Sequence, residues 1–373
     1  MIRKIVHFDL DAFFCAVEEQ RNPALVGKPF AVGGRPQERG VVSSCSYAAR
    51  AFGVRSAMPM RRALRICPQL ILVPPHYRDY LQASQKVMEK IRGFTLLVEQ
   101  ISIDEAFLDI SDSLLSIEST AKNIQDTIIH DFCLPCSLGG ATNKLVAKIA
   151  TDVGKSSTRK SGPPNAITII SPGTEAAFLA PLPTLNLWGI GPKTAERLQK
   201  LGIGTIGELA STPEHELRQI FGRLAHEMLE RAQGIDESPV ITQHETKSIS
   251  QETTFPRDIT NKELLIKTLG TLSKRLANRL RDSNTQAQTI KLKIRWPDFT
   301  TISRQSTLSQ PTDQEQVLHE IAIYLFEKTW KNQQPVRLIG LGVSRLGSKS
   351  LQLGLWDAEA KGIEINDDNL PGT

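Results

Sequence analysis

The stretch Ile101–Ile110 reads ISIDEAFLDI and carries two adjacent carboxylates, Asp104 and Glu105, inside an otherwise strand-like apolar run. Successive side chains of a strand point to opposite faces of its sheet, yet the apolar residues change face at this acid pair. The change predicts a turn or a bulge there, and bulges are common beside active sites. Because a buried carboxylate without a partner is costly, we expect a metal ion or a cationic side chain nearby.

A second acid-bearing strand is expected near the N-terminus, where residues 3–10 are largely apolar and include Asp9. If the two strands lie side by side, Asp9, Asp104 and Glu105 meet at one point. Carboxylates of this kind hold Mg²⁺, with water and substrate phosphates completing the octahedron. The pattern predicts a two-metal phosphoryl-transfer site, although an Asp-Glu pair taken alone is more often a solvated turn.

The composition describes an ordinary soluble globular protein of more than one domain, with 373 residues, 40% of them hydrophobic and 23% charged. The net charge of +5 permits nucleic-acid binding without requiring it. Five scattered cysteines argue against a disulfide framework and fit a reducing cytosol. No stretch reaches the apolar length of a membrane span and no coiled-coil repeat is evident, so we expect a cytoplasmic monomer with no membrane partner.

A short helix is expected after the first strand, with Phe13 and Phe14 adjacent in it. Neighbours in a helix point about 100° apart, so one ring can face the core and the other a pocket; we assign Phe13 to the core. A second short helix follows Ser46, a good N-cap residue, and places Tyr47 and Arg50 on one face. This pair could hold a polyphosphate, since Arg suits phosphate geometry, although such pairs are more often surface residues.

A loop rich in Lys, Ser, Gly and Pro covers residues 154–164. It does not match the phosphate-binding pattern G-x-x-x-x-G-K-[ST], but Lys155 and Lys160 could still reach substrate phosphates from it. The alternating strands and helices that precede this loop predict an α+β or α/β sheet domain with helices on one face.

Several short helices are expected in residues 173–235, around a distinctive turn. Gly189 and Gly191 bracket the turn, Pro192 suits the first position of a helix, and Gly202 closes that helix. This is the helix-hairpin-helix pattern, in which turn amides and a helix N-terminus hold DNA phosphates without reading the base sequence. An ordinary helical hairpin is the alternative.

The C-terminal third is expected to form a small α+β sandwich after a linker. Its predicted elements are helix 262–281, strand 288–296, strand 300–307, helix 313–331 and strand 336–346. An excess of Lys and Arg in its first half indicates either phosphate-backbone contact or a solvated helix face. In the acidic tail, Gln352–Trp356 forms an apolar cluster that seldom persists without a partner; the alternative is a strand end packed on the last domain.

Four motifs in this order resemble the Y-family translesion DNA polymerases, in particular the bacterial DinB type: HFDLDAFF, SYAAR, SIDEAFLD and GIGPKTA. The resemblance covers about residues 1–356 and implies a right-hand arrangement, α+β and multidomain, with an additional little finger. The implied domains are a catalytic palm (1–10 and 74–173), fingers (11–73), a helix-hairpin-helix thumb (174–238), a linker (239–246), a little finger (247–347) and a tail with a clamp-binding peptide (348–373).

The resemblance also implies roles for particular residues. In this family, acids at the positions of Asp9, Asp104 and Glu105 bind two Mg²⁺ ions, and an aromatic residue at the position of Phe14 is the steric gate that excludes ribonucleotides. Further implied contacts are to the nucleotide (Leu10, Tyr47, Arg50 and Lys155), to DNA (Gly189, Gly191, Lys193, Lys247 and Arg337) and to a sliding clamp (Gln352, Leu353, Leu355 and Trp356).

The chain departs from the family pattern after residue 154, where an insertion separates Lys155 from Pro164 and Asn165. Either Lys155 or Lys160 could therefore meet the triphosphate. We favour Lys155 because it keeps its spacing from the preceding helix residues.

We therefore expect a low-fidelity, template-directed DNA polymerase that extends a primer 3′-hydroxyl past lesions and has no proofreading exonuclease. The expected partners are primer-template DNA, deoxynucleoside triphosphates and the sliding clamp of the replicative polymerase. One alternative keeps the metal site but cyclises nucleotides, which leaves the helix-hairpin-helix unexplained. The other is a non-catalytic DNA-binding adaptor, against which the intact set of three acids argues.

Overall fold

The computed structural model describes residues 2–157, 162–331 and 333–348. The chain divides between His244 and Glu245 into two compact units, each with its own hydrophobic core. Within the described residues, no helix combines the length and the apolar character needed to cross a membrane.

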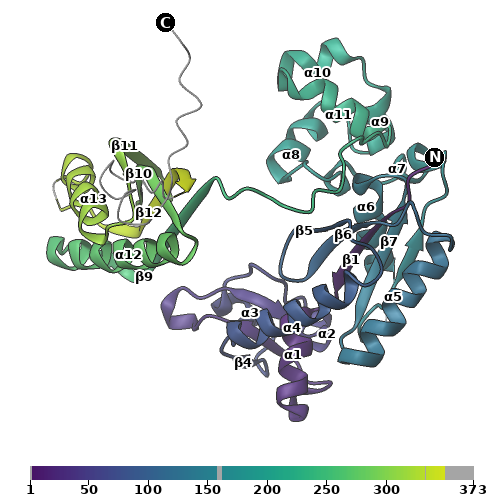
Figure 1. The fold of residues 1–373 in the computed structure, drawn as a ribbon, viewed down its shortest axis with the longest axis horizontal. Coiled ribbons are helices and arrows are strands. Elements are labelled where there is room, and N and C mark those ends of the chain that lie inside the picture. Colours follow the sequence, from purple (N-terminus) through teal and green to yellow (C-terminus); the bar gives the residue numbers. More distant parts are fainter. Residues whose placement is uncertain (1, 158–161, 332, 349–373) are drawn as a thin grey trace, which may run out of the picture. The chain divides into compact units, whose positions relative to one another are not determined.

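A five-stranded sheet lies at the centre of the first unit (Figure 1). In spatial order its strands are β5 (Val98–Gln100), β6 (Glu105–Asp109), β1 (Ile5–Leu10), β7 (Cys136–Ala141) and β8 (Ile167–Ile169). The central strand β1 is antiparallel to both of its neighbours and fully buried. Because side chains alternate along a strand, Val6, Phe8 and Leu10 share one face of the sheet, and His7 and Asp9 share the other.

Helices cover both faces of this sheet, so the expectation of helices on one face was wrong. The helices α4 (Tyr77–Ile91) and α5 (Ile117–Phe132) pack with Val6, Phe8 and Leu10 in one core. The helix α6 (Lys144–Ser157) packs with Ile5 on the opposite face. Its buried apolar stripe, which includes Leu145 and Ile149, is what a helix needs to cover a sheet.

A smaller subdomain is inserted between β1 and α4. Its elements are α1 (Phe13–Arg21), β2 (Phe30–Gly33), β3 (Val42–Cys45), α2 (Tyr47–Ala51), α3 (Met60–Ile66) and β4 (Ile71–Val73), with short 3-10 turns at Pro23–Leu25 and Pro36–Glu38. The three strands form one sheet in the order β3-β2-β4. As predicted, the Ser46 side chain caps α2, by accepting a hydrogen bond from the Ala49 N–H.

The rest of the first unit consists of short helices, which Figure 1 shows above the central sheet. They are α7 (Glu175–Leu179), a 3-10 turn (Thr184–Asn186), α8 (Pro192–Lys200), α9 (Ile206–Ser211), α10 (Glu214–Phe221) and α11 (Leu224–Ala232). Leu198, Ile206 and Leu217 share a core with α6, so these helices are anchored to the sheet domain through it.

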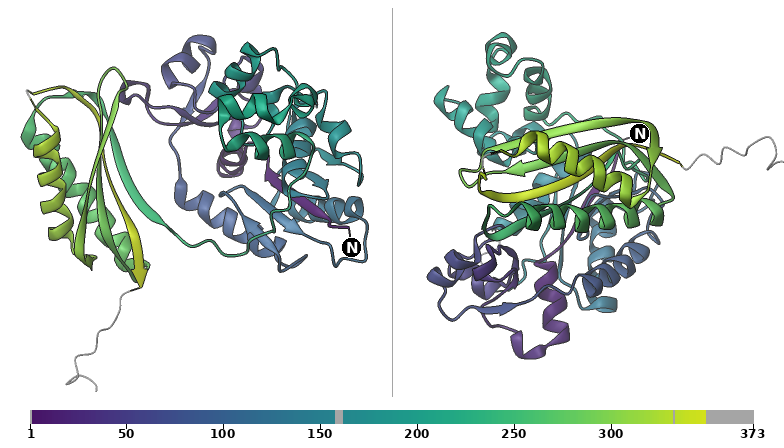
Figure 2. Two further views of the ribbon diagram at one scale, coloured as in Figure 1. Left: turned by 90° about the horizontal axis from the view of Figure 1, so that it is seen from above. Right: turned by 90° about the vertical axis from the view of Figure 1, so that its left-hand side faces the viewer.

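The second unit is a four-stranded antiparallel sheet with two helices on one of its faces (Figure 2). Its elements are β9 (Ser248–Ile259), α12 (Lys262–Asp282), β10 (Thr285–Arg295), β11 (Thr301–Thr312), α13 (Glu315–Thr329) and β12 (Val336–Ser348), with the strand order β11-β10-β12-β9. The predicted order of elements is confirmed, but β11 extends five residues past the predicted strand end at 307.

Candidate active site and DNA-contacting surfaces

Two neighbouring strands bring the three predicted acidic residues together. In the register of β1 and β6, Asp9 lies directly opposite Glu105. Asp104 immediately precedes β6, and its carbonyl accepts a 3.0 Å hydrogen bond from the Leu10 N–H. Residues 101–104 lie outside the strands, with a bend at 102–104, so the predicted turn at the acid pair is confirmed and the strand itself begins only at its second member.

Ser102 holds the carboxylate of Asp104 in place. Its hydroxyl donates a 2.5 Å hydrogen bond to Asp104 Oδ1 and accepts from the backbone N–H groups of Asp104 (3.2 Å) and Glu105 (3.0 Å). Burial raises the pKa of Asp104; the Ser102 hydrogen bond lowers it and the nearby charge of Asp9 adds to the rise. The turn thus presents a carboxylate that a cation would stabilise.

Two lysines of α6 contact the acids, on the face of the sheet that carries His7 and Asp9. Lys148 Nζ lies 3.4 Å from Glu105 Oε1, and Lys155 Nζ lies 2.5 Å from Asp9 Oδ1 and 3.2 Å from Asp11 Oδ1. The lysines are seven residues apart, two helical turns, so they share one face of α6. The structure therefore supplies the cationic partner that was expected for these carboxylates.

In spite of these lysines, burial and a neighbouring carboxylate raise the pKa of Asp9 and of Asp104. Burial raises the pKa of Asp9 to about 7, although Lys155 opposes the rise, and the neighbouring Glu105 contributes to it. As they stand, no three His, Cys, Asp or Glu side chains of the described residues form a ready metal site. However, buried oxygen donors that repel one another fit hard divalent cations such as Mg²⁺, whose charge would relieve the repulsion.

Phe13 takes the core position that was predicted for it, and Phe14 is less buried. Phe13 is 2% exposed and belongs to the core, as expected. Phe14 is half-buried and stacks on Tyr80, with ring centroids 4.3 Å apart and planes at 12°. Tyr77 meets the Phe14 ring edge-on at 6.1 Å. Tyr80 and Tyr77 therefore support the Phe14 ring, and Phe14 follows Asp9 and Asp11 closely in the sequence.

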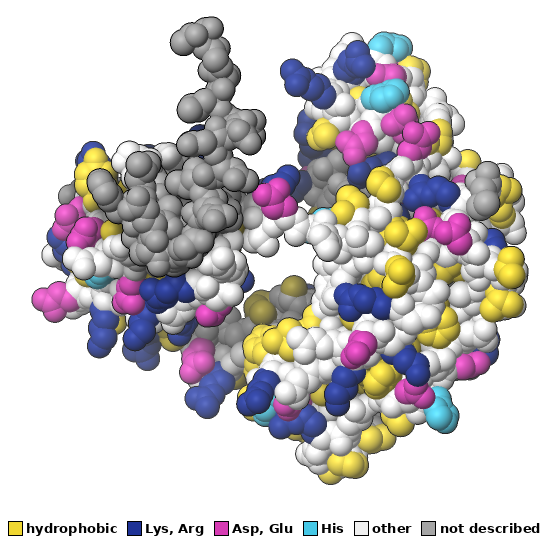
Figure 3. Space-filling model, in the orientation of Figure 1, with side chains coloured by type: hydrophobic (Ala, Val, Ile, Leu, Met, Phe, Trp, Pro, Cys, Tyr) yellow, Lys and Arg dark blue, Asp and Glu magenta, His cyan; other side chains and the backbone are white. Residues whose placement is uncertain are grey.

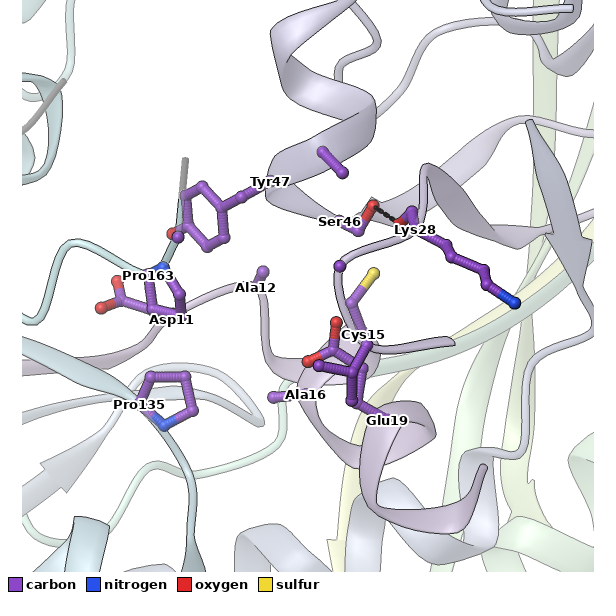
Figure 4. A pocket seen from close by; sticks show the side chains of 14 residues that line it. Asp11, Ala12, Cys15, Ala16, Glu19, Lys28, Ser46, Tyr47, Pro135 and Pro163 are labelled. Atoms are coloured by element: carbon purple, nitrogen blue, oxygen red, sulfur yellow. Dashed lines mark hydrogen bonds between the residues drawn. The ribbon is translucent and has the colours of Figure 1, made fainter. Parts of the chain in front are cut away.

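A cavity of about 250 Å³ is lined by Asp11, which follows β1, and by residues of α1 and α2 (Figure 4). Asp11 and Tyr47 stand on one side of it, and Lys28 and Glu19 on the other. The Tyr47 hydroxyl is buried and has no hydrogen-bond partner within the described part of the chain. The Arg50 guanidinium lies 4.8 Å from the Tyr47 ring centroid, so the predicted pair does share one face of α2.

The helix-hairpin-helix segment has the predicted local geometry. Gly189 has φ of 99°, a backbone conformation that favours glycine, and an added Cβ would also displace the end of the Arg231 side chain, whose Nη1 would lie 2.5 Å away. Gly191 is the N-cap of α8, Pro192 follows in its first turn, and Lys193 is exposed. Thr205 and Glu208 form a capping box at the start of α9. Gly189 and Gly191 are exposed next to Lys193, whereas Ile190 between them is buried and its N–H donates to the Leu187 carbonyl at 2.9 Å.

The face of the second unit's sheet that carries no helix has basic residues beside a glycine band. Lys291 and Lys293 of β10 pair with Gly342 and Gly340 of β12. The resulting shallow groove, about 450 Å³, is also lined by serines 248, 250, 303 and 344. Lys293 Nζ lies 2.7 Å from Glu252 across the groove. We call Lys291, Lys293, Gly340 and Gly342 the open sheet face.

Other cations of this unit lie elsewhere. Lys267, Lys274 and Arg281 stand at seven-residue intervals on the exposed side of α12, where Figure 3 shows dark-blue side chains along the lower edge of the unit. Lys247 is exposed just before β9, and the Arg337 guanidinium lies 4.3 Å from the Phe299 ring centroid. The basic surplus is therefore divided between the sheet and a solvated helix face. The second explanation holds for α12, and phosphate-backbone contact by the sheet stays a prediction.

Some predicted and unpredicted residues remain to be placed. Lys160 and the peptide residues Gln352, Leu353, Leu355 and Trp356 lie outside the described residues. Sequence reasoning missed Lys148 and Ser102 as partners of the acids. The seven-residue spacing of Lys148 and Lys155 was the available signal for the first, and the S-x-D spacing of a side-chain-capped turn for the second.

Three family models match the chain. The impB/mucB/samB family model matches residues 8–152, its C-terminal domain matches residues 246–355, and the IMS family HHH motif matches residues 172–203. The chain is 40% identical to a DNA polymerase IV of Dehalococcoides mccartyi, covering 96% of this chain and 91% of that protein. It is 38% identical to a DNA polymerase IV of Streptococcus mutans, covering 92% of each.

The solved structures that are similar to this chain are also DNA polymerases. A Y-family DNA polymerase chimera, Dbh-Dpo4(243-245)-Dbh, is similar with a TM-score of 0.81 at 26% identity, over 92% of this chain and 99% of that one. An insertion ternary complex of Dbh DNA polymerase is similar with a TM-score of 0.64 at 27% identity, over 91% and 98%. The fold and the order of the subdomains are therefore shared with these proteins along nearly their whole length.

Proposed function

The chain belongs to the Y-family DNA polymerases, of the DNA polymerase IV (DinB) type, and on that premise we propose that Asp9, Asp104 and Glu105 form its catalytic centre. It is a translesion, DNA-directed DNA polymerase. The observation that most supports this centre is the register that sets Asp9 opposite Glu105, with Asp104 one residue away. Nucleotide cyclisation and a non-catalytic adaptor role are not supported, because the relatives matched along nearly the whole chain are DNA polymerases.

We assign the three carboxylates to a pair of Mg²⁺ ions. When bound, these ions would activate the primer 3′-hydroxyl and neutralise the triphosphate and the leaving pyrophosphate. Lys155 is the cation that we assign to the triphosphate, because it already lies among the acids. Although burial lowers the pKa of Lys155, the adjacent Asp9 and Asp11 raise it overall, so the side chain stays charged at neutral pH.

Tyr47, Arg50 and Leu10 complete the proposed nucleotide site. Burial, together with the nearby charge of Asp11, raises the pKa of Tyr47 well above its usual value, so its unpartnered hydroxyl remains a hydrogen-bond donor for a phosphate oxygen. Arg50 adds a fixed positive charge beside it. Leu10 is 2% exposed and its N–H already donates to the Asp104 carbonyl, so its assignment to the nucleotide site rests on the family resemblance alone.

Phe14 is the proposed steric gate against ribonucleotides. Its ring stands next to the acid-bearing end of β1 and is backed by Tyr80, so it cannot retreat from a 2′-hydroxyl without disturbing the stack. Phe14→Ala should admit ribonucleotides in primer extension. Unchanged sugar selectivity would return Phe14 to a purely structural role.

DNA is held, in this proposal, by the helix-hairpin-helix turn and by the second unit. Gly189, Gly191 and Lys193 offer exposed amides and a charge to one phosphate run. The open sheet face, with Lys247 and Arg337, offers cations and small side chains that let a backbone approach closely. None of these groups reads base edges in any contact we assign, which suits a polymerase that must accept any template.

The tail residues Gln352–Trp356 are proposed to bind the sliding clamp, on the basis of the family resemblance. Deleting them should impair clamp-dependent synthesis and spare basal primer extension. Equal loss of both activities would instead assign the peptide to folding of the second unit.

A primer-extension assay tests the central proposal. With Mg²⁺ and each deoxynucleotide in turn, the protein should add the base that complements the template, and omission of the divalent ion should stop addition. Template-independent addition, or extension that persists in a chelator, would contradict a two-metal, template-directed reaction.

A further inference from the structure

A buried carboxylate lies directly behind the proposed steric gate. Glu18 is 3% exposed and stands four residues after Phe14 on α1, so both side chains project from the same face of that helix. Burying a carboxylate is costly unless charged or hydrogen-bonding partners satisfy it. A glutamate kept in this position therefore requires a structural or functional reason.

The partners of Glu18 come mainly from α4 and its N-cap. The Tyr80 hydroxyl donates to Glu18 Oε1, and His76 Nδ1 lies 2.7 Å from the same oxygen. Arg21 Nη1 lies 3.3 Å from Glu18 Oε2. His76 and Tyr80 are again four residues apart, so one helical turn of α1 meets one helical turn of α4.

Tyr80 is thus held at both of its ends by a single helix. Its ring stacks on Phe14, and its hydroxyl is bound by Glu18. The Tyr80 side chain is fully buried. Burial raises the pKa of Tyr80, and the hydrogen bond to Glu18 raises it further, so the hydroxyl keeps its proton and remains a donor.

This arrangement makes displacement of Tyr80 expensive. If the ring moved, the hydrogen bond to Glu18 would break and a buried charged acceptor would be left under-satisfied. Phe14 has Phe13 on one side and Tyr77 at its edge, so the Tyr80 ring is the broad surface against which it rests. A fixed Tyr80 therefore fixes the position of the Phe14 ring.

We propose that Glu18 is a positioning residue for sugar selection: it anchors the Tyr80 hydroxyl and thereby holds the Phe14 ring where a ribose 2′-hydroxyl would collide. The inference rests on the proposed role of Phe14. Glu18 touches neither the sugar nor the reacting atoms, and it acts only through Tyr80.

Two variants separate this role from a general contribution to folding. Tyr80→Phe keeps the stacked ring and removes only the hydroxyl, whereas Glu18→Ala removes the anchor and leaves Tyr80 intact. Glu99→Gln is the matched control, because Glu99 is also a buried carboxylate in the first unit (5% exposed) but pairs with Lys144 at 2.9 Å. The measured quantity is the ratio of kcat/KM for a deoxynucleotide to that for the matching ribonucleotide, with the melting temperature recorded alongside.

Glu18→Ala should lower the selectivity ratio about tenfold, the equilibrium equivalent of losing one hydrogen bond to a charged group. Tyr80→Phe should lower it in the same direction, and Glu99→Gln should leave it unchanged even if the protein melts earlier. Reduced stability of all three variants with an unchanged ratio would overturn the inference. Phe14→Ala, measured in parallel, should reduce the ratio most; if it does not, the gate itself fails, and that result is distinct from a failure of Glu18 alone.

Discussion

The acid site of the first unit and the open sheet face of the second carry charge in opposite ways. Asp9 is 6% exposed and is paired at 2.5 Å with a lysine from another element. Lys291 is exposed, and Lys293 makes a surface pair with Glu252. Charges interact strongly when they are buried and weakly when water surrounds them. One region therefore depends on the exact placement of a few groups, and the other on the sum of many.

This difference agrees with the role that we propose for each region. Phosphoryl transfer requires carboxylates at fixed positions, because positioning and electrostatic stabilisation supply most of the catalysis. Sequence-independent binding of DNA needs only enough cations along a backbone, and it lets the duplex slide along the protein. A single substitution should consequently be catastrophic in the first region and mild in the second.

Asp104→Ala should produce the largest effect. It removes one proposed metal ligand, and primer extension should fall by about 10³-fold or more, as for other residues that act as one catalytic unit. DNA affinity should change little, since the surfaces that we propose to bind DNA phosphates lie elsewhere. The rate of single-nucleotide addition and the Kd for primer-template are the two measurements.

Asp109→Ala is the control for this substitution. Asp109 lies on the same strand, β6, but at its other end, where its carboxylate accepts a 2.9 Å hydrogen bond from the Ser111 N–H. Near-normal extension by Asp104→Ala, or equal loss in both variants, would remove Asp104 from the mechanism.

The second-largest expected effect is a dependence of the protein's stability on pH and on Mg²⁺. Because burial raises the pKa of Asp9 to about 7 from its usual 3.8, the folded protein holds a proton that the unfolded chain releases between these two values. Without divalent ions, stability should therefore fall as pH rises from 4 to 7 and then level off. Mg²⁺ should raise the melting temperature more at pH 8 than at pH 5, because it binds the ionised carboxylates.

Asp9→Asn checks the assignment of that slope. The amide does not titrate, so the variant should lose this part of the pH dependence and most of the gain from Mg²⁺. A melting profile with the same slope and the same response to Mg²⁺ would place the titration and the ion elsewhere.

The two regions also differ in how far the sequence predicts them. The acids, Phe13, the caps of α2 and α9 and the glycine turn follow from local patterns of a few residues. The seven-residue spacing puts Lys148 and Lys155 on one face of a helix, but that this face meets the acids depends on the packing of α6 on β7 and β1, a long-range arrangement that the local spacing does not give. The division of cations between β10 and α12 likewise required the sheet register, because a one-residue shift would turn every side chain to the other face.

Gly340→Ala, on the open sheet face, should have an intermediate effect on stability and on DNA affinity. An added Cβ would meet Glu252 Cβ at 2.9 Å, so β9 or the side chain must shift, at a cost of about 1–3 kcal/mol as for other overpacked sites. The groove would also become shallower, and DNA affinity should fall with it. Gly347→Ala, on the same strand with nothing within 4 Å, should change neither; equal behaviour of the two variants would deny the groove any role.

Lys291→Ala should have the smallest effect. It tests whether each cation of the open sheet face adds its own small contribution to DNA affinity. If Lys291 neutralises one phosphate, the variant should bind all primer-template sequences more weakly by the same factor, and the slope of log K against log salt should decrease by about 1. Single-nucleotide addition at saturating DNA should be unchanged, because the acid site is untouched.

Thr271→Ala, an exposed uncharged position on α12, is the control for a surface change without charge. A loss of catalytic rate at saturating DNA, or a sequence-dependent loss of affinity, would show that this surface does more than hold a backbone, and the contrast with the acid site would no longer hold.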